Sequence, residues 1–251
     1  MNTKLLVTGL CAWLLLSPLS GAASEPDWSD YQALLTSHVH PGNKNGVALK
    51  VVDYPALKAS GDLDQVAAQL AAFPPEKLAN RQERIAYYIN AYNILAMKMV
   101  LGHWPLKSIK DVGSLVSPVW KKPAGKLGGK PVTLDELEHR ILRPMGEPRI
   151  HFAIVCASVS CPDLRTEPYA AHRLDSQLDE QVKLFLGNPS KGLRVEQGSI
   201  RTSKIFDWFK SDFEQAGGVE AFIRRYRPGV PEKLPVKSNL PYDWALNSKG
   251  D

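Results

Sequence analysis

The chain has 251 residues, of which 44% are hydrophobic and 23% are charged, so it has an ordinary globular composition and can bury a substantial core. Its formal net charge is +5, but the basic residues are scattered, and the densest runs are Lys121-Lys122 and Arg224-Arg225. Scattered charge of this kind is typical of a solvated surface and argues against a nucleic-acid-binding protein.

Residues 1–23 have the pattern of a cleaved signal peptide. Lys4 supplies a charged start, residues 5–19 are mostly apolar, and small residues at 20–23 precede a polar segment. The apolar part is too short to span a bilayer. We therefore expect a periplasmic or secreted protein whose mature part, 24–251, is a single globular domain without a membrane span. Its partner would be an unknown envelope protein or peptide.

The first half of the mature chain is expected to be largely helical. A short helical pattern at 31–36 is followed by a turn at 41–43, a strand at 47–52 and a helix at 63–73. The longest helix is predicted at 80–101, with an N-cap pattern at its start and a glycine after its end. Apolar residues lie on nearly all of its sides, so we expect it to be buried at the centre of the fold.

Two amides in this long helix are candidate functional groups. Asn90 and Asn93 are three residues apart and therefore share one face. Buried amides need hydrogen-bond partners, so the simpler hypothesis is that both hold neighbouring loops. The alternative is that one of them binds or orients a catalytic group.

Glu138 is the most informative acidic residue in the sequence. It follows a hairpin expected at 128–129 and lies in a short helix, predicted at 133–142, that begins with a capping box. On an α-helix Glu138 projects into the apolar stripe, only about 40° from Leu134, and His139 lies at the margin of that stripe. An inward carboxylate is costly without a partner, so we expect a histidine or an arginine such as Arg149 beside it.

The stretch RIHFAIVCASVSCPDLR combines an apolar run with two thiols and two hydroxyls. Its first part, Ile150–Cys156, is interpreted as a strand buried on both faces in the middle of a sheet. The strand ends in a loop of small residues, after which the chain continues with Cys161-Pro162. This arrangement suits either a reactive site or a disulfide.

The remaining segments complete an α+β fold. A helix is expected at 176–186, a hairpin with strands at 193–196 and 199–202, two amphipathic segments at 204–213 and 219–226, and a tail whose 242–244 cluster packs back on the sheet. The predicted architecture is the long buried helix packed on a largely antiparallel sheet with Ile150–Cys156 as its middle strand.

Five segments, in this order, resemble the uncharacterised family known as domain-of-unknown-function family 547: YYINAYNILAMKMVL, VTLDELEHRIL, RIHFAIVCASVSCPDLR, SKIFDWFKSDF and YDWALN. The resemblance implies a remote relation to the papain and transglutaminase superfamily of thiol enzymes. The family's characteristic residues are Asn90, Asn93, Glu138, His139, His151, Cys156 and Cys161. Some members carry Asn at the position of His139, which weakens the case for His139 as an indispensable base.

A thiol enzyme needs a cysteine of lowered pKa, a base within hydrogen-bond reach and a group that orients the base. On a continuous strand His151 and Cys156 would lie on opposite faces and roughly 16 Å apart, which makes His151 a poor base for Cys156. Cys161 precedes a proline, and a helix beginning there would stabilise its thiolate. We therefore rank Cys161 before Cys156 as nucleophile, with His151 and His139 as candidate bases and Glu138 as the orienting group.

The favoured function is a cysteine-dependent hydrolase or acyltransferase that acts on amide or peptide substrates in the cell envelope. The alternative is a non-catalytic binding or scaffold module in which Cys156 and Cys161 form a structural disulfide. A histidine nitrogen within about 4 Å of a cysteine sulfur in an open cleft would favour the enzyme, and two bonded sulfurs beneath the surface would favour the module. No motif predicts a cofactor, and the histidines lack the spacing of a zinc site.

Overall fold

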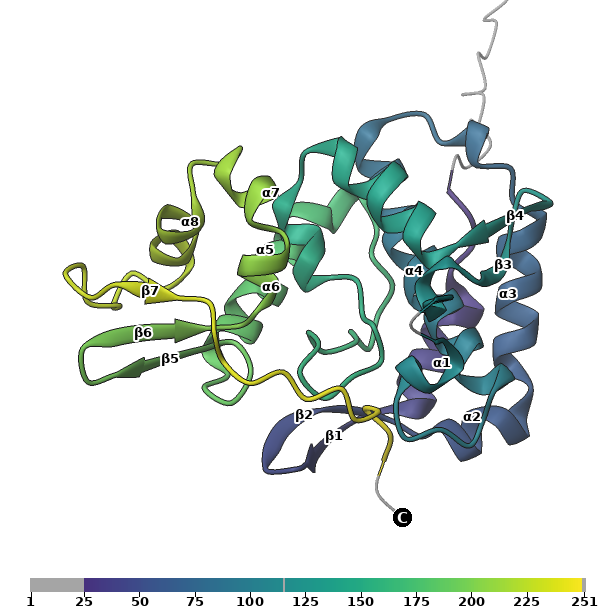
Figure 1. Ribbon diagram of the computed structural model, residues 1–251. Coiled ribbons are helices and arrows are strands. Elements are labelled where there is room, and N and C mark those ends of the chain that lie inside the picture. The colour runs from purple at the N-terminus through teal and green to yellow at the C-terminus, as the bar shows by residue number, and fades with distance from the viewer. Residues whose placement is uncertain (1–24, 115, 250–251) are drawn as a thin grey trace, which may run out of the picture.

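The computed structural model describes residues 25–114 and 116–249, so the expected signal segment lies outside the described residues (Figure 1). The α-helices are α1 (Ser29–His38), α2 (Tyr54–Ser60), α3 (Asp62–Ala72), α4 (Arg81–Gly102), α5 (Leu174–Gly187), α6 (Ile205–Trp208), α7 (Lys210–Glu214) and α8 (Val219–Tyr226). The strands are β1 (Val39–Lys44), β2 (Val47–Val52), β3 (Pro123–Leu127), β4 (Lys130–Thr133), β5 (Leu193–Glu196), β6 (Ser199–Thr202) and β7 (Val236–Lys237).

Short helical turns connect these elements. Six of the described turns are 3-10 helices: η1 (Pro75–Lys77), η2 (Ile109–Val112), η3 (Val119–Lys121), η5 (Arg143–Met145), η6 (Pro148–Phe152) and η7 (Ala171–Arg173). The segment η4 (Glu136–Leu142) is a π-helix, in which backbone hydrogen bonds join residues five apart and not four apart as in an α-helix.

Helix α4 is the buried centre of the fold, as the sequence predicts. At its start the Asn80 side chain accepts a hydrogen bond from the Glu83 N–H at 2.9 Å, and the Glu83 carboxylate reaches back to the Ala79 N–H at 2.7 Å. These contacts satisfy N–H groups that have no partner within the helix. Most of the side chains of α4 belong to the largest hydrophobic cluster of the protein. Among the described residues no helix is both long and apolar enough to cross a membrane.

The strands form three small separate sheets and confirm the α+β class. Strands β1 and β2 form one antiparallel hairpin, β3 and β4 form a second, and β5 pairs antiparallel with β6, which pairs in parallel with β7. The predicted strands at 47–52, 193–196 and 199–202 occur at these positions. The turn predicted at 41–43 is wrong, because these residues lie in β1 and the chain turns at Asn45-Gly46, where both residues have positive φ.

The predicted strand Ile150–Cys156 does not exist, so the expectation that it forms the middle strand of a sheet is wrong. Pro148–Phe152 forms the 3-10 helix η6, and the following residues are irregular although they are buried. Glu147 accepts a hydrogen bond from the Arg149 N–H at 3.1 Å, and Pro148 at the first helical position suits a helical start. An apolar run without periodicity indicates burial, but it cannot distinguish a strand from another buried segment.

Two large hydrophobic clusters meet around this segment. One surrounds α4, and the other joins Phe152 to the apolar faces of α5 to α8. The ring of Phe152 packs against those of Phe185, Phe206, Phe213 and Phe222. In Figure 1 the irregular chain after η6 runs between α1–α4 and the C-terminal helices. The two cysteines therefore lie at the junction of the two clusters.

The C-terminal tail packs back on the cysteine loop. The Val159 N–H donates to the Ala245 carbonyl at 2.8 Å, and the Val52 N–H of β2 donates to the Asn247 carbonyl at 2.9 Å. Figure 1 shows the tail passing from β7 across the molecule to the region of β1 and β2. The tail packs back on the rest of the fold as expected, although it covers the cysteine loop and the edge of the β1–β2 hairpin and not a sheet with Ile150–Cys156 in its middle.

Candidate functional site

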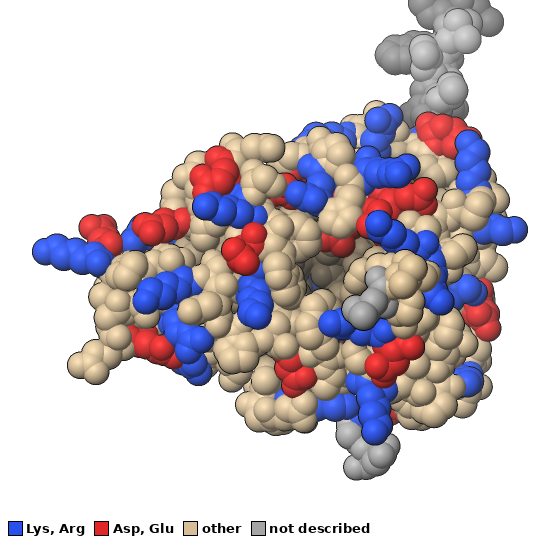
Figure 2. Space-filling model, viewed as in Figure 1, with Lys and Arg blue, Asp and Glu red and all other residues tan. Residues whose placement is uncertain are grey.

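A cavity of about 370 Å³ lies where the two clusters meet. All five residues predicted to be catalytic line it: Glu138, His139, His151, Cys156 and Cys161. Figure 2 shows a hollow near the middle of the face of the molecule that is also seen in Figure 1. The expected separation of His151 and Cys156 is wrong, because a helical turn and a loop replace the strand and bring both side chains to one cavity.

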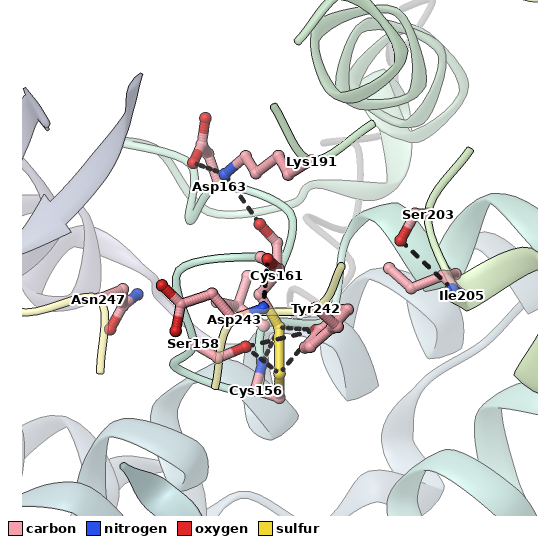
Figure 3. Close-up of a disulfide and its surroundings, with 12 residues drawn as sticks. Cys156, Ser158, Cys161, Asp163, Lys191, Ser203, Ile205, Tyr242, Asp243 and Asn247 are labelled. Atoms are coloured by element: carbon pink, nitrogen blue, oxygen red, sulfur yellow. Dashed lines mark hydrogen bonds and ion pairs between the residues drawn. A yellow bond between two sulfur atoms is a disulfide. The ribbon is translucent and has the colours of Figure 1, made fainter. Parts of the chain in front are cut away.

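Cys156 and Cys161 are joined by a disulfide, with their Cα atoms 6.2 Å apart. Figure 3 shows Tyr242 and Ser158 beside this bond. The Tyr242 hydroxyl oxygen is 3.4 Å from each sulfur, and the Cys156 N–H donates to the Cys161 sulfur at 3.0 Å. Cys161 is only 3% exposed and Cys156 is partly buried, yet both line the cavity. The disulfide is therefore not sealed inside the core.

The loop that carries the disulfide is held by a buried lysine that does not line the cavity. The Lys191 ammonium donates to the Cys161 carbonyl at 2.9 Å and pairs with the Asp163 carboxylate at 2.6 Å (Figure 3). Ala157 adopts φ +60°, a conformation that is uncommon for a residue with a side chain. The helix expected after Cys161 is absent, so hydrogen bonds and not a helix N-terminus act on this sulfur.

Asn90 and Asn93 hold loops, as the simpler hypothesis states. The Asn90 side-chain amide accepts a hydrogen bond from the Tyr169 N–H at 2.9 Å and donates one to the Tyr169 carbonyl at 2.8 Å. The Asn93 amide donates to the Ala153 carbonyl at 3.0 Å and accepts from the Val155 N–H at 2.8 Å. Helix α4 thus positions the backbone immediately before Cys156.

Replacing Asn93 by Ala is expected to lower the free energy of unfolding by about 2–4 kcal/mol, because a buried N–H and a buried carbonyl both lose their partner. The control is Asn80→Ala at the exposed start of the same helix, where loss of the cap costs about 1 kcal/mol. Urea denaturation of both variants measures the difference. Equal losses would contradict the role of Asn93 in holding the loop.

His151 is buried and is held by Asp212. Its Nε2 atom is 2.8 Å from a carboxylate oxygen of Asp212, and its ring stacks on Phe209 with the ring centres 3.9 Å apart. The Arg143 guanidinium donates two hydrogen bonds of 2.8 Å to the same carboxylate. Burial raises the pKa of Asp212, but the hydrogen bonds from Arg143 and His151 outweigh it and hold this pKa well below its usual range.

This pairing determines which nitrogen of His151 is basic. An ionised carboxylate only accepts hydrogen bonds, so Nε2 carries the proton and Nδ1 carries the lone pair. Nδ1 is buried and has no hydrogen-bond partner among the residues that the structure describes. Burial lowers the pKa of His151 by more than the hydrogen bond to Asp212 raises it. The ring is therefore neutral near pH 7 and can accept a proton at Nδ1.

Glu138 does not orient a histidine. Its carboxylate is 3.5 Å from the Tyr92 hydroxyl, and Arg149, the partner considered from the sequence, instead pairs with the carboxylates of Glu147, Asp175 and Asp179. Burial raises the pKa of Glu138 to about 7, although Arg143 and the Tyr92 hydroxyl act in the opposite direction. Near neutral pH the cavity therefore contains a carboxyl group that is partly protonated.

His139 lines the cavity, and its side chain is 40% exposed. Its Nδ1 atom is 2.9 Å from a guanidinium nitrogen of Arg143, and its Nε2 atom is 3.9 Å from the Asp135 carboxylate. Burial and the charge of Arg143 lower its pKa. Both ring nitrogens already have neighbours on the helix, so His139 is less available as a base than His151.

Sequence reasoning missed Asp212, Arg143 and the aromatic wall of the cavity. The wall contains Trp208 from α6 and Tyr242 and Trp244 from the tail. The segment SKIFDWFKSDF contains Trp208 and Asp212, and the segment YDWALN contains Tyr242 and Trp244. Both segments carry the family resemblance, but the sequence alone indicates no chemistry for these four residues. Among residues 25–114 and 116–249, no group of three or more His, Cys, Asp or Glu side chains is placed to hold a metal ion.

Comparison with known proteins identifies an uncharacterised family. No curated protein and no solved structure matches the chain, so the remote relation to papain and transglutaminases stays a prediction. Residues 75–186 match the model of the family described as "Protein of unknown function, DUF547". The matched segment includes α4, η4 and both cysteines, but it ends before Asp212 and Tyr242. This match over residues 75–186 agrees with the resemblance that the sequence indicated.

Proposed function

We propose that the protein, once its disulfide is reduced, is a cysteine-dependent hydrolase or acyltransferase that acts on amide or peptide substrates. The observation that carries this proposal is the His151–Asp212 pair. The basic nitrogen of His151 has no hydrogen-bond partner among the described residues, and its ring lines the same cavity as both cysteines. A nucleophile, a base and a group that orients the base are the parts that a thiol enzyme requires.

Cys161 is the favoured nucleophile. Its sulfur accepts hydrogen bonds from the Cys156 N–H and the Tyr242 hydroxyl, and such donors stabilise a thiolate after reduction. In the disulfide form no hydrogen bond joins a histidine to either sulfur within the described part of the chain. Reduction by an external dithiol, which is itself oxidised to a disulfide, gives the two cysteines two electrons and two protons. Both side chains can then change rotamer, which is needed for Cys161 to approach His151.

The reaction would then follow the general course of thiol catalysis. His151 takes the Cys161 proton at Nδ1, and the sulfur attacks the substrate carbonyl carbon to form a C–S bond. Collapse of this adduct breaks the bond to the leaving amine, which receives the proton from His151. Water or a second amine cleaves the thioester and restores the thiol, while the Asp212 carboxylate stabilises the imidazolium.

A non-catalytic binding module is the second candidate. The disulfide favours it, since a bonded sulfur cannot act as a nucleophile. A disulfide is also typical of oxidising compartments, which supports the proposal that residues 1–23 direct export to the periplasm or secretion. In both cases the partner would be a protein or peptide of the cell envelope.

The redox state and the alkylation rate of the two cysteines separate the candidates. In protein purified without reductant, we expect a disulfide that mild reductant opens in the folded state, because both sulfurs line the cavity. Cys161 should then alkylate with an apparent pKa well below the ordinary value of about 8.5. Peptide mapping by mass spectrometry after iodoacetamide labelling at several pH values measures this.

Two tyrosine variants sharpen the experiment. Tyr242→Phe removes a donor to the Cys161 sulfur and should raise the apparent pKa of that thiol. Tyr226→Phe is the matched control, because its hydroxyl contacts Asp179 and is not among the groups that line the cavity. A disulfide that opens only on unfolding, or thiols that titrate at the ordinary value, would support the binding module.

A further inference from the structure

We propose that the cavity recognises an alkylated ammonium group, held between the Glu138 carboxylate and the aromatic wall of Trp208, Tyr242 and Trp244. If the ammonium group belongs to the substrate or acyl acceptor of a thiol enzyme, this inference rests on the function proposed above. Binding of the ammonium group does not depend on that function, because the disulfide form already contains the cavity and all four side chains.

The aromatic wall offers several ring faces to a cation. The rings of Trp208 and Trp244 are stacked with centres 5.7 Å apart, and Tyr242 lies 4.8 Å from Trp208 and 4.6 Å from Trp244. Trp208 is 44% exposed, which is unusual for so large an apolar side chain. The faces of such rings carry negative electrostatic potential and attract cations. The Lys110 ammonium already lies 4.7 Å from the centre of Trp244, consistent with this preference.

Glu138 supplies the matching charge. It is the single Asp, Glu, Lys or Arg side chain among the described residues that line the cavity. The groups that interact with its carboxyl are Tyr92 on α4, Arg143 on η5, Tyr242 in the tail, and the carboxylates of Asp135 and Asp212. The cations Lys110 and Lys121 lie near Trp244 and His139 respectively, but neither lines the cavity. The interior is therefore acidic and aromatic.

A bound cation and a proton compete at Glu138. Burial makes the ionised form of this carboxyl unfavourable, and an ammonium group beside it would favour that form again. Binding should therefore release a proton, and the affinity should rise as the pH passes through about 7. A neutral ligand of the same shape would bury the same apolar area without this dependence on pH.

The test compares choline with 3,3-dimethyl-1-butanol, which has the same shape without the charge. Tryptophan fluorescence of the disulfide form is titrated with each at pH 6 and pH 8. We expect choline to bind at least about tenfold more tightly than the neutral alcohol at pH 8 and about tenfold more tightly at pH 8 than at pH 6, whereas the neutral alcohol shows no dependence on pH.

Variants identify the groups responsible. Glu138→Gln should abolish the pH dependence and the preference for choline, and Trp208→Leu should weaken choline binding at both pH values. Asp135→Asn, at a nearby acid that does not line the cavity, should leave the preference for choline intact. The proposal would be overturned if both ligands bound with equal affinity or if neither bound. It would also be overturned if the pH dependence of choline binding persisted in Glu138→Gln. The disulfide form cannot perform thiol chemistry, so this proposal and the proposed function can fail separately.

Discussion

In the reduced protein, replacing His151 by Asn is expected to slow the acylation of Cys161 by p-nitrophenyl acetate by about 10²- to 10⁴-fold, the usual contribution of a general base. The physical reason is the unpartnered Nδ1 atom, which the Asp212 carboxylate keeps in its basic form. The burst of nitrophenolate in a single turnover measures the acylation rate directly, whatever the natural substrate is.

His139→Asn is the matched control for this experiment. His139 lines the same cavity, but its Nδ1 atom lies against Arg143, so its loss should change the acylation rate little. Asp212→Asn should cause an intermediate loss, because an amide no longer enforces the tautomer of His151. If the two histidine variants lost activity equally, or if neither did, His151 would not be the base.

Replacing Glu138 by Gln is expected to raise the free energy of unfolding at pH 8 by up to about 3 kcal/mol and to leave it almost unchanged at pH 4. Burial raises the pKa of Glu138 from 4.5 to about 7 in the folded protein, so the folded state holds this proton more tightly than the unfolded state. The resulting stabilisation is present below pH 4.5 and is lost as the pH rises through 7. A glutamine cannot ionise and avoids the loss.

Urea denaturation at the two pH values tests this prediction, with Glu76→Gln as the control at an exposed carboxyl. The control should change stability little at either pH. If Glu138→Gln stabilised the protein equally at pH 4 and pH 8, better packing of the amide and not the removal of a charge would be the cause. A carboxyl group that destabilises the fold at neutral pH is best explained by a role in the cavity, such as the binding of a cation.

Local patterns in the sequence predicted much of the secondary structure. The α4 helix and its cap, the helical segment that starts at Thr133, the β5–β6 hairpin and α8 all occur where short-range signals place them. These signals depend on residues three or four apart or on a tight turn, so they can be recognised in the sequence without knowledge of the tertiary structure. The candidate residues from Glu138 to Cys161 line one cavity, although the sequence had indicated opposite faces of a strand for His151 and Cys156.

The backbone at 150–156 could not be predicted in this way. Its apolar run shows that the segment is buried, but some of its N–H and carbonyl groups find their partner far away in the chain and others find it within a local turn. The Asn93 side chain forms hydrogen bonds with the Ala153 carbonyl and the Val155 N–H. A helical turn over Pro148–Phe152 replaces the first part of the expected strand. A buried backbone needs hydrogen bonds, and a distant side chain can supply them as well as a neighbouring strand.

By itself, the sequence determined the α+β class and the buried central helix, and it supplied the candidate residues for the thiol chemistry proposed here. Only the tertiary structure decided how these residues combine: Asp212 and not Glu138 holds His151, Tyr242 reaches both sulfurs, and the cysteines are bonded to each other. The physical reason is distance along the chain. Asp212 lies 61 residues after His151 and Tyr242 lies 81 residues after Cys161, and only the packing of the two hydrophobic clusters brings such residues together.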